Sequence, residues 1–156
     1  LIDHIDTRIK EPKSIVKKME KKKYDKTYLN LIEKINDIAG IRIVCTLKDD
    51  IFFIRDLVKQ IPDIHVLKEK DYVTNPKESG YSSYHMIVEV PVKLTQKTIY
   101  VKCEIQIRTL AMDFWASFEH KVKYKTKNDV NPKMSKELVS CAKMINKFDT
   151  KMINYK

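Results

Sequence analysis

The sequence predicts a single α/β (α+β) domain in which about four β-strands alternate with helices. The chain has 156 residues, of which 43% are hydrophobic, enough for one core and too few for two ordinary domains. Apolar residues repeat at helical spacing in some segments and at strand spacing in others. Turn-forming Pro, Gly, Asn and Ser residues separate these segments. Together these observations predict one mixed domain over residues 1–156.

Two helices are expected before the first strand. Residues 12–23 begin with Pro12, which is favoured in a first helical turn, and continue with apolar residues at helical spacing. A shorter helix is expected over residues 29–34. Cations and backbone amides converge near the start of the first helix, where the helix dipole stabilises an anion such as a triphosphate. The alternative is a solvated lysine face. The side chains concerned are Arg8, Lys10, Ser14, Lys17 and Lys18.

A buried central strand is expected over residues 35–47, which are apolar and rich in β-branched side chains. Arg42 lies among aliphatic residues in this strand, where a charge needs a partner or a function. Asp37 stands at the start of the strand, a position from which a carboxylate can reach a metal ion. The alternative role of Asp37 is a helix or turn cap.

A packing helix over residues 49–61 follows and is ended by Pro62, and residues 64–67 form a short strand. The stretch 70–85 then predicts a loop, because it contains turn dipeptides. Gly80 is expected to take a positive φ that presents Tyr81 at the mouth of the next strand. The lysines, tyrosines, histidine and hydroxyls of this loop suit a phosphorylated, aromatic ligand, although a plain polar hairpin loop is the alternative.

Two further strands are expected at residues 84–92 and 98–107, where apolar and polar side chains alternate. Alternation places Glu104, Gln106 and Arg108 on one face, with successive side chains about 7 Å apart. A solvent-facing surface is the default interpretation of such a row. The presence of Asp37 favours another, because one or two carboxylates and substrate phosphates commonly hold Mg²⁺ in phosphoryl-transfer sites.

Two helices are expected to end the chain, at residues 109–125 and about 132–155. The last has a long apolar stripe, which predicts an oligomer contact. The chain begins with Leu1, and an N-terminal piece is expected to precede it. No apolar run approaches the roughly 20 residues of a membrane helix, and no signal segment opens the chain, so a soluble cytoplasmic protein is expected.

The cysteines indicate the redox environment of the protein, and the distribution of charge indicates which partners it could bind. The three cysteines lie far apart in apolar patterns, which predicts reduced, buried thiols. The net charge of +10 gathers in residues 8–26 (+6) and 121–156 (+7). Such basic segments at both ends suit a polyanionic ligand or nucleic acid, but lysine-rich solvated helices that bind no ligand have the same net charge. The cysteines are Cys45, Cys103 and Cys141.

Six motifs in order resemble the synthetase domain of the RelA/SpoT family, and most of all its single-domain branch, the small alarmone synthetases. The resemblance covers nearly the whole chain. The motifs are Arg8-Ile9-Lys10 with Ser14 and Lys18; residues 37–42; Lys70-Asp71-Tyr72 with Asn75-Pro76-Lys77 and Gly80-Tyr81; His85; residues 104–109; and residues 112–120.

The resemblance implies a nucleotidyltransferase-like mixed β-sheet of about four to five strands flanked by helices. It also implies transfer of the β,γ-pyrophosphoryl group of ATP to the 3′-hydroxyl of GDP or GTP. The products would be AMP and ppGpp or pppGpp, the alarmones of the stringent response. No counterpart of the family's hydrolase domain is present, so only synthesis is expected. Single-domain members are often tetramers, which makes a homo-oligomer the expected assembly.

Carried over residue by residue, the family's donor site places Arg8 and Arg42 on the two faces of adenine. Asp37 and Glu104 would bind Mg²⁺, and Glu104 would also take the proton from the attacking 3′-hydroxyl. The side chains that would hold the ATP phosphates are Lys10, Ser14 and Lys18.

On the acceptor side, Tyr81 would stack on guanine, a contact worth roughly 1 to 3 kcal/mol. The sequence departs from the family here, because Ser79 replaces a usual Asn and Ser82 a frequent Arg. Both changes shorten a side chain that could touch the nucleotide and leave the choice between GDP and GTP open. The other implied acceptor residues are Lys70, Lys77, His85 and Gln106.

An alternative from another class is a basic RNA-binding module with a silent nucleotide site. Its lysine-rich helices would contact phosphates, and its affinity for RNA would fall steeply as salt rises. Secondary RNA binding by an active enzyme is also compatible with the charge pattern. A generic nucleotidyltransferase is a third option, and it would release pyrophosphate rather than AMP.

Overall fold

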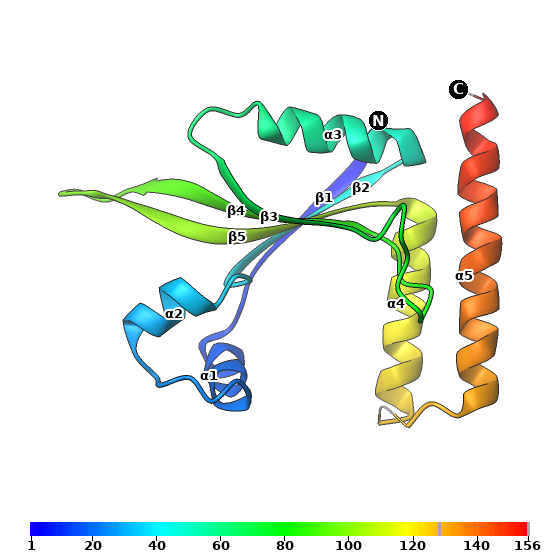
Figure 1. The fold of residues 1–156 in the computed structure, drawn as a ribbon, viewed down its shortest axis with the longest axis horizontal. Coiled ribbons are helices and arrows are strands. Elements are labelled where there is room, and N and C mark those ends of the chain that lie inside the picture. The colour runs from blue at the N-terminus through cyan, green and yellow to red at the C-terminus, as the bar shows by residue number, and fades with distance from the viewer. Residues whose placement is uncertain (128, 156) are drawn as a thin grey trace.

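The computed structural model describes residues 1–127 and 129–155, and among these residues it forms a five-stranded sheet flanked by helices (Figure 1). The strands are β1 (Ile2–Ile9), β2 (Ala39–Cys45), β3 (His65–Asp71), β4 (Tyr84–Lys93) and β5 (Thr98–Thr109). The helices are α1 (Pro12–Lys21), α2 (Tyr28–Lys34), α3 (Lys48–Lys59), α4 (Leu110–Lys125) and α5 (Pro132–Met152), followed by the 3-10 helix η1 (Ile153–Tyr155). The α/β fold and the sheet size expected from the sequence are confirmed.

The sheet has the strand order β1-β2-β5-β4-β3 and is mixed. β2 and β5 pair in parallel, whereas the β1–β2, β4–β5 and β3–β4 pairs are antiparallel. A parallel pair cannot be joined by a tight turn, so the chain needs a long crossover, here made of α3, β3 and β4. This crossover brings residues 39–45 beside residues 103–109 at the centre of the sheet.

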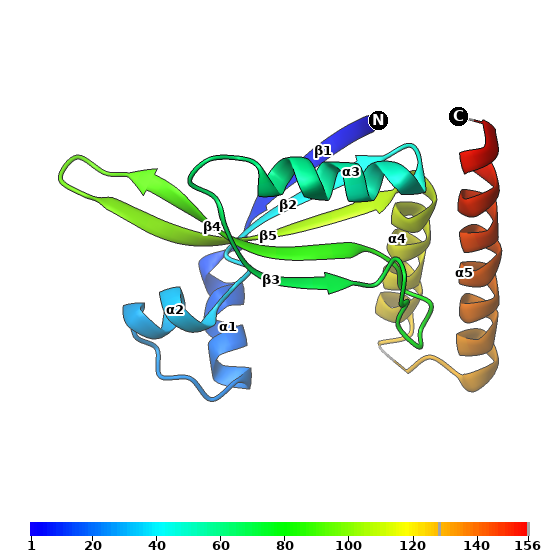
Figure 2. The same cartoon turned by 45° about the horizontal axis from the view of Figure 1, so that its top comes forward.

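Helix α3 covers one face of the sheet, and α1 and α2 lie on the opposite side (Figures 1 and 2). The covered face contains the main core, in which Ile51 and Ile54 of α3 pack against Ile43, Ile105 and Ile107. Alternate residues of β2 and β5 point the other way, toward α1 and α2. The sheet therefore has one apolar face, covered by α3, and a second face on which functional side chains can lie.

Helices α4 and α5 stand side by side beyond the end of β5 (Figures 1 and 2). Thr109 links the three elements, because its hydroxyl accepts a hydrogen bond from the backbone N–H of Met112 at 3.1 Å and donates one to Asp149 of α5 at 2.6 Å. Asn131 caps α5 in the same manner, at 2.8 Å from the N–H of Met134. The contacts of Thr109 fix the direction in which α4 leaves the sheet, and the Asn131 cap fixes the start of α5.

Three parts of the sheet differ from the expectation. Strand β1 was not predicted, because its eight residues are all exposed and carry no burial pattern. The central strand begins at Ala39 rather than at residue 35, so Asp37 precedes it. Strand β3 reaches Asp71, and Lys70 therefore pairs with His85 inside the sheet instead of lying in a loop. In each case hydrogen bonding to a neighbouring strand decides the structure.

The chain between β3 and β4, here called the 72–83 loop, rests on α4 and α5. Gly80 has φ +91°, which confirms the expected positive value. A Cβ atom added to Gly80 would lie 2.4 Å from the Cβ of Ala142 and 3.5 Å from Trp115. The loop therefore approaches the α5 backbone as closely as a glycine permits.

The expectations for the cysteines and for the apolar stripe of α5 are partly confirmed. Cys45 and Cys103 are buried, but Cys141 is exposed on α5, which corrects the expectation of three buried thiols. Met144 and Phe148 of α5 are 60% and 57% exposed, so part of the stripe has no cover. None of the helices in the described ranges is long and apolar enough to cross a membrane.

We predict that Gly80→Ala lowers the free energy of unfolding by about 1 to 3 kcal/mol, because the added Cβ overlaps the Cβ of Ala142 at a strained φ. Chemical denaturation with urea measures this. Gly40→Ala is the matched control, since its added Cβ finds ordinary contacts at 3.6 Å or more. Equal stability of the two variants would contradict the close seating of the loop.

Candidate active site

The polar face of the sheet contains two adjacent rows of residues that run across all five strands. In the first row, Asp6, Arg42, Gln106, His85 and Lys70 are neighbours in the strand register. Each residue comes from a different strand, and the row lies on the face opposite α3. Four of its five members were candidate site residues in the sequence. The sheet thus brings together side chains that are up to 100 residues apart in the chain, from Asp6 to Gln106.

The second row crosses the sheet two residues away, so its side chains point to the same face. It contains Arg8, Gly40, Glu104, Ile87 and Lys68. Gly40 leaves room above the sheet, and the Cγ and Nε atoms of Arg8 lie 3.6 Å from where a Cβ would be. Arg8 therefore folds over Gly40 of the central strand, on the face that also carries Arg42.

Asp37 is held by two lysines from elements that precede it. The Asp37 carboxylate accepts from the Lys10 ammonium at 2.5 Å and from the Lys18 ammonium at 2.7 Å. Burial alone would raise the pKa of Asp37, but the two ion pairs outweigh it and hold the pKa below its ordinary value. Lys10 follows β1 and Lys18 lies on α1, so the unpredicted strand β1 helps to position this carboxylate.

Glu104 lies near Asp37 and has polar partners of its own. His85 Nδ1 is 3.3 Å from one carboxylate oxygen, and Gln106 Nε2 donates to the other at 3.3 Å. The hydrogen bond with His85 is the main cause that lowers the pKa of Glu104, while the nearby charge of Asp37 opposes the shift. The two carboxylates are thus close enough to influence each other, and Glu104 is ionised at neutral pH.

Two grooves meet at these carboxylates. The smaller groove, of about 100 Å³, is lined by Arg8, Arg42 and neighbouring residues of β1 and β2. The larger groove, of about 500 Å³, extends over β3, β4 and α1. Asp37 and Glu104 line both grooves. The lysines of the larger groove are Lys18, Lys22, Lys34, Lys68, Lys70 and Lys77.

This arrangement fits two polyphosphate ligands and a divalent cation. Lysines along the larger groove attract phosphates. Two carboxylates at the junction provide oxygen ligands of the kind that Mg²⁺ prefers, and phosphates and water would complete its coordination. Each carboxylate has about four lone-pair sites, so the lysine contacts of Asp37 leave acceptor capacity. Within the described part of the chain, no group of three or more His, Cys, Asp or Glu side chains is gathered as a metal site.

Tyr81 contacts the polar face from the 72–83 loop. Its hydroxyl lies 2.9 Å from His85 Nε2 and accepts a hydrogen bond from Arg108 Nη2 at 3.1 Å. The Lys77 ammonium lies 4.9 Å from the centroid of the Tyr81 ring and 4.7 Å from that of Tyr72. The Lys77 ammonium therefore contacts both rings, and Tyr72 and Lys77 line the larger groove. Tyr72 was not among the expected site residues.

Arg108 and Asp113 form a connection that the sequence analysis missed. Arg108 is only 3% exposed and donates to Gln106 at 2.6 Å and to Asp113 at 3.2 Å. The same Asp113 oxygen is 3.6 Å from Nη1 of Arg42, which supplies the partner expected for that arginine. The alternation of β5 placed Arg108 on one face with Glu104, but it gave no sign of the contact with Asp113. Asp113 has no comparable signal, because its partners are distant in sequence.

The remaining candidate residues are placed less centrally. Ser14 is exposed on the first turn of α1, near Lys10 and Lys18 in the chain. Gln106, which the family resemblance assigns to the acceptor, lines the smaller groove. Ser79 accepts a long hydrogen bond, 3.4 Å, from the backbone N–H of Tyr81. The side chain at position 79 thus supports the 72–83 loop.

Known proteins are similar to this chain over nearly its whole length. Residues 7–129 match the model of the region found in RelA / SpoT proteins. The chain is 46% identical over 155 residues to the GTP pyrophosphokinase YwaC of Bacillus subtilis (strain 168), covering 99% of this chain and 74% of that protein.

Solved structures are similar over the same extent. The small alarmone synthetase 2 from Bacillus subtilis superimposes with a TM-score of 0.90 at 45% identity, covering 99% of this chain and 80% of that one. The small alarmone synthetase 1 from the same organism, bound to its product pppGpp, gives a TM-score of 0.88 at 36% identity, covering 99% and 78%.

The lowered pKa of Asp37 predicts an acid-dependent loss of stability. A carboxyl whose pKa is lower in the folded state stabilises the fold above its unfolded pKa, and this contribution is lost as the pH falls through the folded pKa. The wild-type free energy of unfolding should therefore fall more steeply than that of Asp37→Asn as the pH drops below about 4. Urea titrations at several pH values measure both slopes. Parallel curves would contradict the ion-pair assignment.

Proposed function

The chain belongs to the RelA/SpoT family, and from this membership we propose that it is a GTP pyrophosphokinase, a small alarmone synthetase that makes ppGpp or pppGpp. The observation that carries the proposal is the position of Asp37 and Glu104, which line both grooves. A donor in one groove and an acceptor in the other would meet at these carboxylates. Pyrophosphoryl transfer requires this juxtaposition, because its catalysis rests on positioning and on charge stabilisation.

ATP occupies the smaller groove in this proposal. Arg8 and Arg42 enclose adenine between planar guanidinium groups, which stack on aromatic faces. The buried Nε of Arg42 has no hydrogen-bond partner among the described residues and is available to a ligand. The phosphates extend toward Asp37, where α1 presents cations. The residues that bind them are Lys10, Ser14 and Lys18.

Mg²⁺ is the cofactor that we propose for Asp37 and Glu104, where it would neutralise charge on the transferred phosphates. Phosphate oxygens would also compete for Lys10 and Lys18, which now neutralise Asp37. Both lysines can thus exchange a carboxylate for a phosphate without leaving the site. Their ion pairs keep the cations positioned before the donor binds.

The guanine nucleotide occupies the larger groove. Tyr81 stacks on guanine once the Lys77 ammonium leaves the ring and binds a phosphate. Lys70 and His85 line the groove beside it, and Gln106 supports Glu104 from the neighbouring row position. Ser79 and Ser82 are shorter than the residues usual in the family. Direct measurement will therefore decide whether GDP or GTP is the preferred acceptor.

Glu104 is the base that accepts the proton of the ribose 3′-hydroxyl. A base must be ionised at working pH and within hydrogen-bond reach of the hydroxyl. The lowered pKa of Glu104 meets the first condition, and its position at the groove junction supports the second. His85, which contacts Glu104 at 3.3 Å, orients the carboxylate.

We also propose that the protein works in the cytoplasm as a homo-oligomer, with a tetramer as the expected form. Large apolar side chains on the two C-terminal helices support self-association, because they have little cover within one chain. Phe114 and Phe118 of α4 are 69% and 50% exposed, and Met144 and Phe148 of α5 are 60% and 57% exposed.

With ATP, Mg²⁺ and GDP, the wild type should form AMP and a more highly phosphorylated guanosine in equal amounts. Asp37→Asn and Glu104→Gln should each lower the rate of AMP formation at least roughly 100-fold, because a metal ligand or the base is lost. Ion-exchange chromatography of the products measures the rate. Asp56→Asn, an exposed carboxylate on α3, is the matched control and should keep full activity.

The metal assignment fails if either variant retains wild-type turnover while circular dichroism shows an intact fold. The enzyme proposal itself fails if the wild type binds both nucleotides but forms no such product. Tight RNA binding that is lost between low and moderate salt would then favour the RNA-binding alternative.

Tyr81→Ala should raise the KM for the guanine nucleotide about 5- to 150-fold and leave the KM for ATP nearly unchanged. The reason is the loss of a stacking contact worth roughly 1 to 3 kcal/mol. Initial-rate kinetics with each substrate varied in turn measure both constants. Tyr124→Ala, at an 82% exposed tyrosine of α4, is the control. An equal rise of both KM values would show that Tyr81 acts on the fold rather than on guanine.

A further inference from the structure

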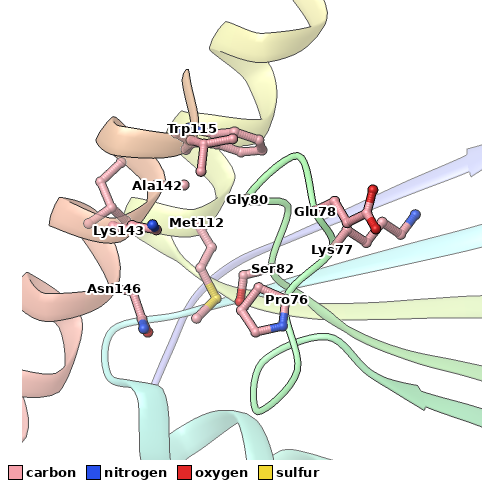
Figure 3. Close-up of a pocket in the computed structure, with 12 residues that line it drawn as sticks. Pro76, Lys77, Glu78, Gly80, Ser82, Met112, Trp115, Ala142, Lys143 and Asn146 are labelled. Carbon is pink, nitrogen blue, oxygen red and sulfur yellow. The ribbon is translucent and has the colours of Figure 1, made fainter. Parts of the chain in front are cut away.

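A separate cavity of about 410 Å³ lies between the 72–83 loop and the helices α4 and α5 (Figure 3). Its volume falls within the range of small-molecule sites. The cavity shares Lys77 with the larger groove and no residue with the smaller groove. Nothing in the proposed reaction occupies it. We call it the loop cavity.

The 72–83 loop forms the wall between the loop cavity and the site of the guanine nucleotide. Gly80 and Ser82 line the cavity, while Tyr81 between them bonds to His85 and Arg108 on the polar face. The side chain of Lys77 points away from Met112 (Figure 3). The Tyr81 side chain also packs against the cluster of Trp115, Leu138 and Ala142, so Tyr81 contacts both the polar face and the two helices.

The remaining walls of the cavity define the chemistry of a ligand. Met112 and Trp115 of α4 and Ala142 of α5 make it largely apolar. The Ser82 hydroxyl is buried and has no hydrogen-bond partner in the part of the chain that the structure describes. Buried hydroxyls normally have a partner, so this one indicates a place for a polar ligand atom. Lys143 supplies a positive charge from α5, whereas Glu78 points away from the helices (Figure 3).

We propose that the loop cavity binds a ring-containing apolar molecule with one anionic group, and that this binding tightens the binding of the guanine nucleotide. The ring would lie against Trp115 and Met112, and the anion near Lys143. A molecule wedged between the loop and the helices stabilises the loop in the arrangement that presents Tyr81 and Lys77 to the acceptor. The effect on the acceptor rests on the proposed function, whereas ligand binding does not.

Trp115 gives a direct readout, because it is the single tryptophan of the chain and lines the cavity. The probe is 8-anilinonaphthalene-1-sulfonate, an apolar aromatic anion that accepts excitation energy from tryptophan. Titration into the wild type should give saturable energy transfer from Trp115. Reciprocity requires GDP to strengthen probe binding and the probe to lower the Kd of GDP, each about fivefold.

Two variants and a control test the location. Lys143→Glu reverses a charge at an exposed position and should weaken probe binding at least tenfold, as should Val139→Phe, which fills the cavity. Lys147→Glu makes the same charge change at an exposed position on α5 that does not line the cavity, and it should bind like the wild type. Thermal unfolding confirms that each variant is folded.

Three results would overturn the proposal: no saturable transfer from Trp115, equal probe binding by Lys143→Glu and the wild type, or displacement of the probe by GDP. Displacement would make the cavity part of the acceptor site. The Kd of GDP, measured by equilibrium dialysis with and without probe, tests the coupling without turnover. Absence of pyrophosphokinase activity therefore refutes the proposed function alone.

Discussion

The parallel register of β2 against β5 is the constraint on which the rest of the site depends. It places Gly40 beside Glu104 and Arg42 beside Gln106, so that residues from two distant motifs share one face. A slip of one residue would turn the whole polar set toward α3 and the apolar core. The core opposes such a slip, because Ile43, Ile105 and Ile107 must remain under α3. The burial of one face thus determines the chemistry of the other.

A buried arginine connects the two halves of this polar face. Burial lowers the pKa of the Arg108 guanidinium, and the neighbouring Tyr81 and Asp113 oppose this shift and stabilise the buried positive charge. Its contacts reach Tyr81 and Asp113, and Asp113 also faces Arg42. The arginine that we propose for adenine and the tyrosine that we propose for guanine are therefore joined through two side chains. This network holds Tyr81 in place before any nucleotide arrives, which reduces the ordering that binding requires.

The sequence predicted what depends on local pattern and missed what depends on pairing between distant elements. Alternation in β5 correctly placed Glu104, Gln106 and Arg108 on one face, and the turn dipeptides correctly indicated the positive φ of Gly80. Strand β1 escaped prediction because it is exposed along its whole length and is held by hydrogen bonds to β2. Lys70 was assigned to a loop because the stretch 70–85 contains turn dipeptides, although pairing with β4 makes Lys70 part of a strand. The ion pairs of Lys10 and Lys18 with Asp37 form between elements that are distant in sequence, and so do the contacts of Asp113. No periodic pattern in the sequence could predict them.

The central claim is that a donor and an acceptor meet at Asp37 and Glu104 for transfer of an intact pyrophosphoryl group. Isotope tracing from ATP labelled at the β-phosphate tests it most directly. With GDP as acceptor and Mg²⁺ present, the label should appear in the 3′-phosphorylated guanosine product and be absent from AMP. Label retained in ADP would show ordinary phosphoryl transfer, and label in free pyrophosphate would show nucleotidyl transfer. Either result would contradict the account.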